Sequence, residues 1–166
     1  MVSVIIALRL ESWVDNPTNT HDTIAGMIQG GMDFSPSSPQ LAALDKELTV
    51  AREILGLGLN LTSDPSNTTT TTTTLPLGVG FLLFHPSLTH FETTALPILR
   101  HHRPRAVWLF APPVELESNP ESHSRALVKR IVAVLRAEGI VVFFQVGNVR
   151  AAREAVGLYS VDVVVA

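Results

Sequence analysis

The sequence predicts an α/β fold built on a parallel sheet, and three features of the chain indicate it. Short runs of almost continuously apolar residues, each of strand length, recur through the second half of the chain, and amphipathic helical segments separate them. Strands that are apolar throughout are typical of a sheet covered on both faces, and intervening helices favour parallel pairing. The composition agrees, because 46% of the 166 residues are hydrophobic and only 16% are charged, unlike a disordered chain. Periodicity alone does not separate a doubly wound sheet from a barrel.

The first well-marked element is a helix that follows Ser38 and ends near Gly56. Ser38 suits the N-cap and Pro39 suits the first helical position. Leucines then recur at steps of three and four, which places them on one helical face. Gly56 can close the helix.

From residue 77 onward, strands and helices alternate. The sequence predicts strands over 77–84, 106–111, 140–146 and 161–166. It predicts helices over 87–102, from Asn119 and Pro120 to about Glu138, and after the cap residue Asn148. We expect the strands to pair in parallel in the order of the sequence, with right-handed crossovers.

Two segments fall outside this pattern. Residues 1–23 match no pattern, and residues 60–74 contain seven consecutive threonines, Thr68 to Thr74. A polar run of this kind buries no apolar area, so we interpret 60–74 as an insertion that extends a surface loop. The predicted organisation is an unassigned segment at 1–23 and one domain over 24–166 that carries the insertion.

Composition and motifs exclude several classes of protein. The net charge of −3 argues against a nucleic-acid binder, and the absence of cysteine excludes disulfides and thiolate metal sites. No apolar run has the length of a membrane span, and the short apolar stretch Val2 to Leu10 lacks the basic region of an export signal. We therefore expect a cytoplasmic location and no membrane partner. The spacing of histidines and acids suggests no metal site, and no glycine-rich nucleotide loop occurs.

Several stretches, taken in order, carry a family resemblance. They are residues 28–36 (IQGGMDFSP), the helix at 38–55, residues 75–87 (LPLGVGFLLFHPS), and the strands within 103–166. Together they resemble nitronate monooxygenases, also called 2-nitropropane dioxygenases, and the sequence is most similar to those of fungal members. The resemblance implies a partial (β/α)8 TIM barrel, roughly strands two to six. It also implies the cofactor FMN and oxidation of alkyl nitronates by O2 to a carbonyl compound and nitrite.

The resemblance also suggests two cofactor-binding residues. Gly80 stands where many members place an asparagine near the flavin, and it could let the ring approach the backbone or serve only for packing within the strand. Gln145 stands where relatives direct a polar residue toward the cofactor, or it is a hydrogen-bonded amide at a strand end. His85 could face the barrel mouth or be an ordinary loop residue.

No catalytic residue is assigned from the sequence. The family's catalytic histidine lies in a Gln-Gly-x-Glu-Ala-Gly-Gly-His segment, which does not occur in these residues. The family's phosphate-binding glycines also lack a counterpart, so we expect the 166-residue chain alone to bind FMN weakly or not at all and not to turn over nitronates. His101 and His102 are explained by the negative end of a helix, and Asp162 by a structural contact.

Three interpretations stay open at this point. The first is an FMN-dependent nitronate monooxygenase represented by an incomplete sequence. The second is a truncated, non-catalytic relative, and the third is a flavin-dependent enoyl reductase of the same superfamily. An oligomeric state is not predicted.

Overall fold

A computed structural model of the chain describes residues 24–57, 73–110 and 123–165. The N-terminal segment 1–23, most of the predicted insertion at 60–74, and the expected helix start at Asn119 and Pro120 lie outside these residues. Of the helices within the described ranges, none combines the length and hydropathy that crossing a membrane requires.

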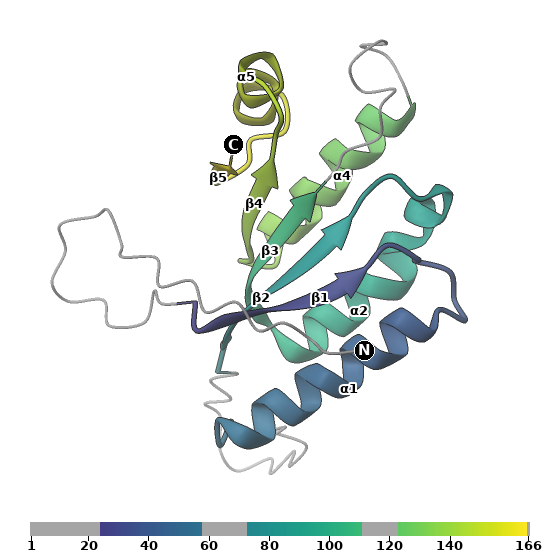
Figure 1. Cartoon of the computed structure of the whole chain (residues 1–166), viewed down its shortest axis with the longest axis vertical. Helices are drawn as coiled ribbons and strands as arrows, with labels where there is room; N and C mark the ends of the chain where they lie inside the picture. The colour runs from purple at the N-terminus through teal and green to yellow at the C-terminus, as the bar shows by residue number, and fades with distance from the viewer. Residues whose placement is uncertain (1–23, 58–72, 111–122, 166) are drawn as a thin grey trace, which may run out of the picture.

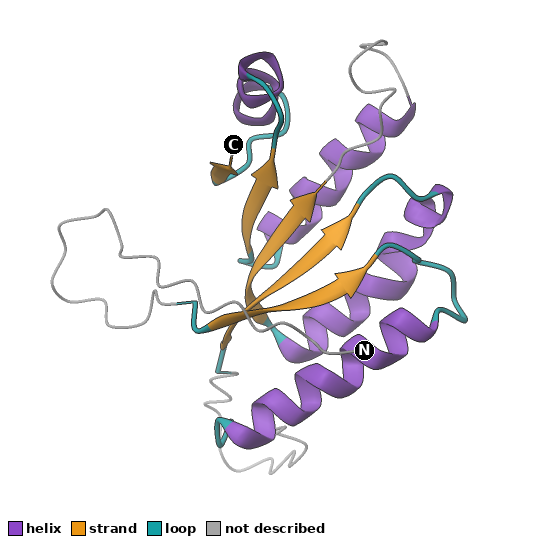
Figure 2. Cartoon of the chain, viewed as in Figure 1, coloured by secondary structure: helices purple, strands orange, loops and turns teal. Residues whose placement is uncertain are grey.

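Strands and helices alternate along the whole described chain (Figure 2). In order, the elements are β1 (Gly26–Gly31), α1 (Pro39–Ile54), β2 (Leu75–Leu82), the short 3-10 helix η1 (Pro86–His90), α2 (Phe91–His102), β3 (Pro104–Phe110), α4 (His123–Ala137), β4 (Val141–Gln145), α5 (Val149–Gly157) and β5 (Val163–Val165). The strands form one parallel sheet in the order β1-β2-β3-β4-β5 (Figure 1). The predicted parallel pairing in sequence order is thereby confirmed.

The predicted helix caps are present. The Ser38 side chain accepts a hydrogen bond from the Leu41 amide at the start of α1, and Asn148 does the same for Ala151 at the start of α5. Gly56 follows α1 with φ of +65°, a left-handed conformation that glycine adopts without a steric penalty. These caps satisfy backbone groups that the helix ends would otherwise leave unpaired.

Some boundaries differ from the sequence prediction. Strand β2 begins at Leu75 instead of residue 77, because the Leu75 amide donates to the Arg103 carbonyl across the sheet. Strand β3 begins at Pro104, directly after Arg103 ends α2 in a left-handed conformation with φ of 51°. The helix expected over 87–102 divides into η1 and α2.

Alternate residues of the strands enter two separate apolar clusters. Val79, Phe81, Val107 and Phe144 belong to the larger cluster, which includes buried residues of α1, α2, α4 and α5. Ala106 and Phe143 belong to a smaller cluster with half-buried Trp108, Val141, Val163 and Val165. Because successive side chains of a strand point to opposite faces, the larger cluster marks a helix-covered face and the smaller one marks a helix-free face.

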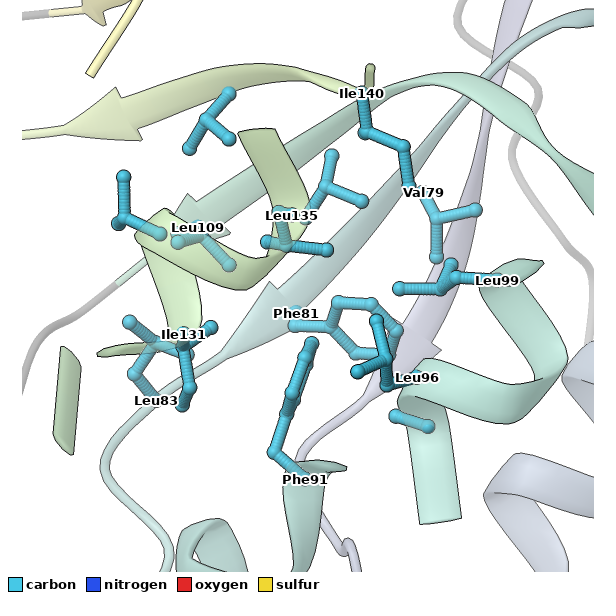
Figure 3. Packing of buried hydrophobic residues seen from close by; sticks show 14 of the residues in the cluster. Val79, Phe81, Leu83, Phe91, Leu96, Leu99, Leu109, Ile131, Leu135 and Ile140 are labelled. Atoms are coloured by element: carbon cyan, nitrogen blue, oxygen red, sulfur yellow. The ribbon is translucent and has the colours of Figure 1, made fainter. Parts of the chain in front are cut away.

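The helix-covered face holds the larger of the two apolar clusters. Figure 3 shows Phe81 of β2 beside Phe91 of α2, with Leu96 and Leu99 close by. The two phenyl rings meet edge to face, with centroids 5.5 Å apart and an interplanar angle of 82°, which is a favourable aromatic geometry.

The arrangement differs from a doubly wound sheet. A doubly wound sheet reverses its strand order at a switch point and carries helices on both faces. Here the order is sequential, and the described helices pack on one face only. The strands are apolar throughout because the helix-free face is itself lined by apolar side chains.

Candidate functional site at the carboxyl edge of the sheet

The carboxyl ends of the five described strands lie along one edge of the sheet, because every pairing between them is parallel. In parallel α/β folds this edge carries the ligand site. Two groups of side chains are found there: an aromatic surface on the helix-free face, and a polar cluster in the loops after β1 and β2.

Gly80 lies in the middle of the helix-free face and is buried. It is in register with Gln29 of β1 and Trp108 of β3. A Cβ atom on Gly80 would come 2.8 Å from Cε2 of Phe110, which is too close for an unstrained contact. Gly80 therefore makes room for the Phe110 ring, which is the packing interpretation of this residue.

Three aromatic residues form a surface beside Gly80, which we call the aromatic ledge: Trp108, Phe110 and Phe143. The Trp108 and Phe110 rings are nearly parallel, with centroids 5.2 Å apart and an interplanar angle of 5°. Phe143 of the neighbouring strand β4 stacks on Trp108, with centroids 5.7 Å apart and an interplanar angle of 27°. The buried Trp108 Nε1 has no hydrogen-bond partner among the described residues. Sequence reasoning missed the ledge, although aromatic residues two apart in a predicted strand must share a face.

Gln145 is the last residue of β4 and its side chain is exposed. It is two residues beyond Phe143 in the same strand, so it shares the helix-free face with the aromatic ledge. Its register partner is Val165 of β5. The structure thus places both sequence-predicted residues, Gly80 and Gln145, on one face of the sheet.

The polar cluster consists of Asp33, Ser87 and His85, and we call it the His–Ser–Asp cluster. The Ser87 hydroxyl lies 3.2 Å from Asp33 Oδ1 and 2.6 Å from Nδ1 of His85. The Ser87 amide also donates to His85 Nδ1 at 3.2 Å, so His85 caps the 3-10 helix η1. Sequence reasoning singled out His85 alone, because Asp33 and Ser87 are 54 residues apart in the chain.

Backbone contacts hold the loop after β1 in place. Gln40 Oε1 accepts hydrogen bonds from the amides of Met32 and Asp33 at 2.9 and 3.0 Å. The Phe34 amide donates to the Ser87 hydroxyl at 2.8 Å. The Phe34 ring is fully buried against Phe81. The His–Ser–Asp cluster is therefore anchored to the helix-covered core on one side.

The Asp33 carboxylate is stabilised in its charged form. Hydrogen bonds from the Ser35 amide, and then from the Ser35 hydroxyl, lower the pKa of Asp33, and Ser87 and His85 contribute further. A charged acceptor at this position favours the orientation in which Ser87 donates its hydroxyl proton to Asp33.

Two residues discussed from the sequence lie at the opposite edge. His102 is fully buried, and its Nε2 lies 2.8 Å from Asp45 Oδ1 of α1, so it joins two helices in addition to standing at a helix end. Asp162 accepts hydrogen bonds from the Val142 amide at 2.9 Å and from Arg136 at 3.2 Å, consistent with a structural contact. Within the described ranges, no group of three or more potential metal ligands comes together.

Comparison with known proteins adds a relative. The sequence is 43% identical over 142 residues to a nitronate monooxygenase of Neurospora crassa. The chain is homologous to nitronate monooxygenases. The match covers 85% of this chain and 35% of the relative, so the chain spans about a third of that protein. The resemblance to nitronate monooxygenases drawn from the sequence motifs is confirmed. No family model matches the sequence, and no solved structure matches it.

Proposed function

We propose that this chain contributes part of the active site of an FMN-dependent nitronate monooxygenase, which oxidises alkyl nitronates with O2 to a carbonyl compound and nitrite. The observation that carries the proposal is the 43% identity to the Neurospora crassa protein. The geometry supports it, because the sequence-predicted residues Gly80 and Gln145 share one face of a parallel sheet near its carboxyl edge.

The proposal includes a partial (β/α)8 barrel over residues 24–166, with an insertion at 60–74. In such a barrel the strands follow one another in sequence order, the helices form the outer layer, and apolar side chains fill the interior. The sequential order of the sheet and its helix-free apolar face have this form. On this interpretation the helix-free face is the barrel interior.

The described residues fit the ring system of a flavin. The aromatic ledge offers rings against which a flavin can stack, and Gly80 leaves the space that one of them, Phe110, occupies. The unpartnered Trp108 Nε1 is a donor without an acceptor, and a buried donor of this kind favours a ligand that supplies one. The Gln145 amide can both donate and accept at the end of its strand.

The described part of the chain fits the phosphate of FMN less well than it fits the flavin ring. Arg125 and Arg150, near the amino ends of α4 and α5, both contact Glu154, at 2.9 and 3.7 Å. The Glu154 carboxylate thus partly neutralises the positive charge that a phosphate would need. We therefore assign the ring, and not the phosphate, to the described residues.

When bound, FMN supplies the electron acceptor that this oxidation requires. The roles of the chain follow from its surface: the aromatic ledge, for which Gly80 leaves room, positions the ring and excludes water from one side, and Gln145 orients it by hydrogen bonding. A neutral nitroalkane would also need a positioned base, whereas a nitronate has already lost that proton. We expect the chain to favour the nitronate.

The test measures two things separately: binding of the flavin ring, and reduction of bound FMN by a nitronate. Free FMN and lumiflavin, which is the ring system without the ribityl phosphate chain, are titrated into the purified chain and the flavin absorbance is followed. We expect similar, weak affinities for the two. With FMN at saturation and without oxygen, propionate 3-nitronate should bleach the flavin faster than it bleaches free FMN, whereas the parent nitroalkane should not.

The outcomes separate the interpretations. Absence of any spectral change with either flavin would contradict the assignment of the flavin ring to the described residues and would agree with the sequence expectation that the chain alone does not bind FMN. Bleaching by NADPH in place of the nitronate would favour the enoyl reductase. Steady nitrite release in oxygen would show that these residues also contain the complete site, contrary to the sequence expectation.

A further inference from the structure

Gln29 of β1 is a polar residue on the helix-free face that sequence reasoning did not single out. The preceding residue, Ile28, packs against the helix-covered core. Met27 lies on the other face, where its Sδ would be 3.1 Å from a Cβ atom placed on Gly78. Because successive side chains of a strand alternate, Gln29 points to the helix-free face together with Met27, and its side chain is exposed there.

The register of the sheet places Gln29 in one row with the aromatic ledge. Gln29 is the partner of Gly80, and Gly80 is the partner of Trp108. Trp108 is in turn paired with Phe143. Gly80 has no side chain, and the Phe110 ring occupies the space beside it. With neighbouring strands about 4.8 Å apart, the Gln29 amide therefore borders the ledge on its β1 side.

Two carboxamides flank a surface that is otherwise apolar. Apart from the Trp108 indole, Gln29 and Gln145 are the polar side chains that the described strands place on this face. Gln145 belongs to β4 and stands on the opposite side of the ledge. Among the described residues, nothing forms a hydrogen bond with the Gln29 amide. Both its donor and its acceptor are available to a ligand.

The chemistry of this face favours a neutral ligand group over an anion beside Gln29. The described strands place no charged side chain on the face, and an anion that leaves water needs a compensating charge. A carboxamide carries an N–H donor and a carbonyl acceptor side by side. It therefore matches an uncharged edge that presents N–H next to C=O, such as the imide edge of the flavin ring.

We propose that Gln29 is a cofactor-binding residue whose carboxamide pairs with the imide edge of the flavin ring. Its oxygen accepts a hydrogen bond from the imide N–H of the ring, and its NH2 group donates to the adjacent ring carbonyl. Gln145 then contacts the ring from the opposite side of the ledge. This inference rests on the proposed function for its ligand, whereas the direction and the free amide of Gln29 rest on the structure.

The binding test uses two uncharged flavins. Lumiflavin carries the imide N–H, and 3-methyllumiflavin has a methyl group in place of that hydrogen. Each is titrated into the purified chain while the flavin fluorescence is followed. The wild-type chain should bind lumiflavin about three- to tenfold more tightly, which is the effect of one hydrogen bond between neutral groups. Gln29→Leu should bind the two flavins equally.

Gln145→Leu is the matched control, because it makes the same substitution on the opposite side of the ledge. It should weaken the binding of both flavins alike and keep the preference for lumiflavin. A preference that persists in Gln29→Leu, or that Gln145→Leu also loses, would overturn the inference and leave the proposed function intact. If neither flavin binds the wild-type chain, the assignment of the ring to the described residues fails and this inference fails with it.

A second measurement needs no flavin. If Gln29 serves a ligand and not the fold, Gln29→Leu should leave the urea midpoint unchanged or raise it, because no hydrogen bond among the described residues is lost. Gln40→Leu is the contrasting variant: Gln40 Oε1 accepts from the amides of Met32 and Asp33, so its loss should lower the midpoint. A lower midpoint in Gln29→Leu would assign Gln29 to the fold and overturn the inference.

Discussion

The two faces of the sheet use alternate residues of the same strands in different ways. On the helix-covered face, Phe81 and Leu109 are completely buried against helices of the same chain. On the helix-free face, Trp108 and Phe110 are only partly buried, and the indole nitrogen of Trp108 has no partner among the described residues. The comparison teaches that the helix-covered face contributes most of the buried apolar area that stabilises the fold. The helix-free face retains partly exposed aromatic rings and an unpaired indole N–H, which a ligand or further strands would cover.

The largest expected loss of stability comes from a substitution on the helix-covered face. Phe81→Ala removes a ring that contacts Phe34 and Phe91 and leaves a cavity, so the free energy of unfolding should fall by about 3–5 kcal/mol. Phe110→Ala removes the same number of atoms from the helix-free face. It should cost about 1–2 kcal/mol, because the Phe110 ring is only partly buried and its removal loses less buried apolar area. Urea denaturation followed by circular dichroism measures both. Equal losses would show that the two faces are equally packed.

An intermediate effect comes from the helix-free face at Gly80. Gly80→Ala forces the Phe110 ring to move, because the new Cβ would lie 2.8 Å from it, and overpacking of this kind costs about 1–3 kcal/mol. Gly78→Ala on the same face is the control. Its Cβ would meet the flexible Met27 side chain at 3.1 Å, so its effect should be smaller.

The same denaturation experiment contains its own check. Combining Gly80→Ala with Phe110→Ala should recover part of the loss, since the residue that is crowded is gone. A double variant whose loss equals the sum of the single losses would contradict the steric explanation.

The smallest expected effect is the contribution of His102 to the pH dependence of stability. Burial lowers the pKa of His102, although the hydrogen bond to Asp45 opposes this, and His101 and Arg52 lower it further. Below the ordinary histidine pKa of about 6.5, the unfolded chain therefore binds a proton that the folded chain does not. Stability from this group is complete above that pH and declines as the pH falls toward the lowered pKa.

Urea midpoints between pH 7.5 and pH 5.5 measure the effect. His102→Gln keeps a donor for Asp45 and removes the titrating ring, so its stability should depend less on pH than that of the wild-type chain. His90→Gln, at an exposed position in η1, is the matched control and should keep the wild-type dependence, because His90 is not among the groups that act on the pKa of His102. Identical pH dependence in all three proteins would contradict the assignment to His102.

The candidate site was predictable from the sequence only in part. Gly80 and Gln145 were predicted from the family resemblance and from their positions in the strands, and their role in cofactor binding stays a prediction. Their shared face follows from strand alternation once the register is known. The His–Ser–Asp cluster was not found, because Ser87 meets Asp33 across 54 residues. No local pattern encodes that contact, since it depends on β1 and β2 being neighbours.

The sequence by itself determined most of the elements and their order, although it did not predict β1, Gly26–Gly31. Apolar runs of strand length, helical faces with leucine at steps of three and four, and caps such as Ser38 and Asn148 are local features, and the structure retains each of them. Only the tertiary structure decided that all the described helices pack on one face and that His102 is a buried link to Asp45. The physical reason is that periodicity specifies which residues are buried, whereas the partners that bury them depend on how distant segments pair.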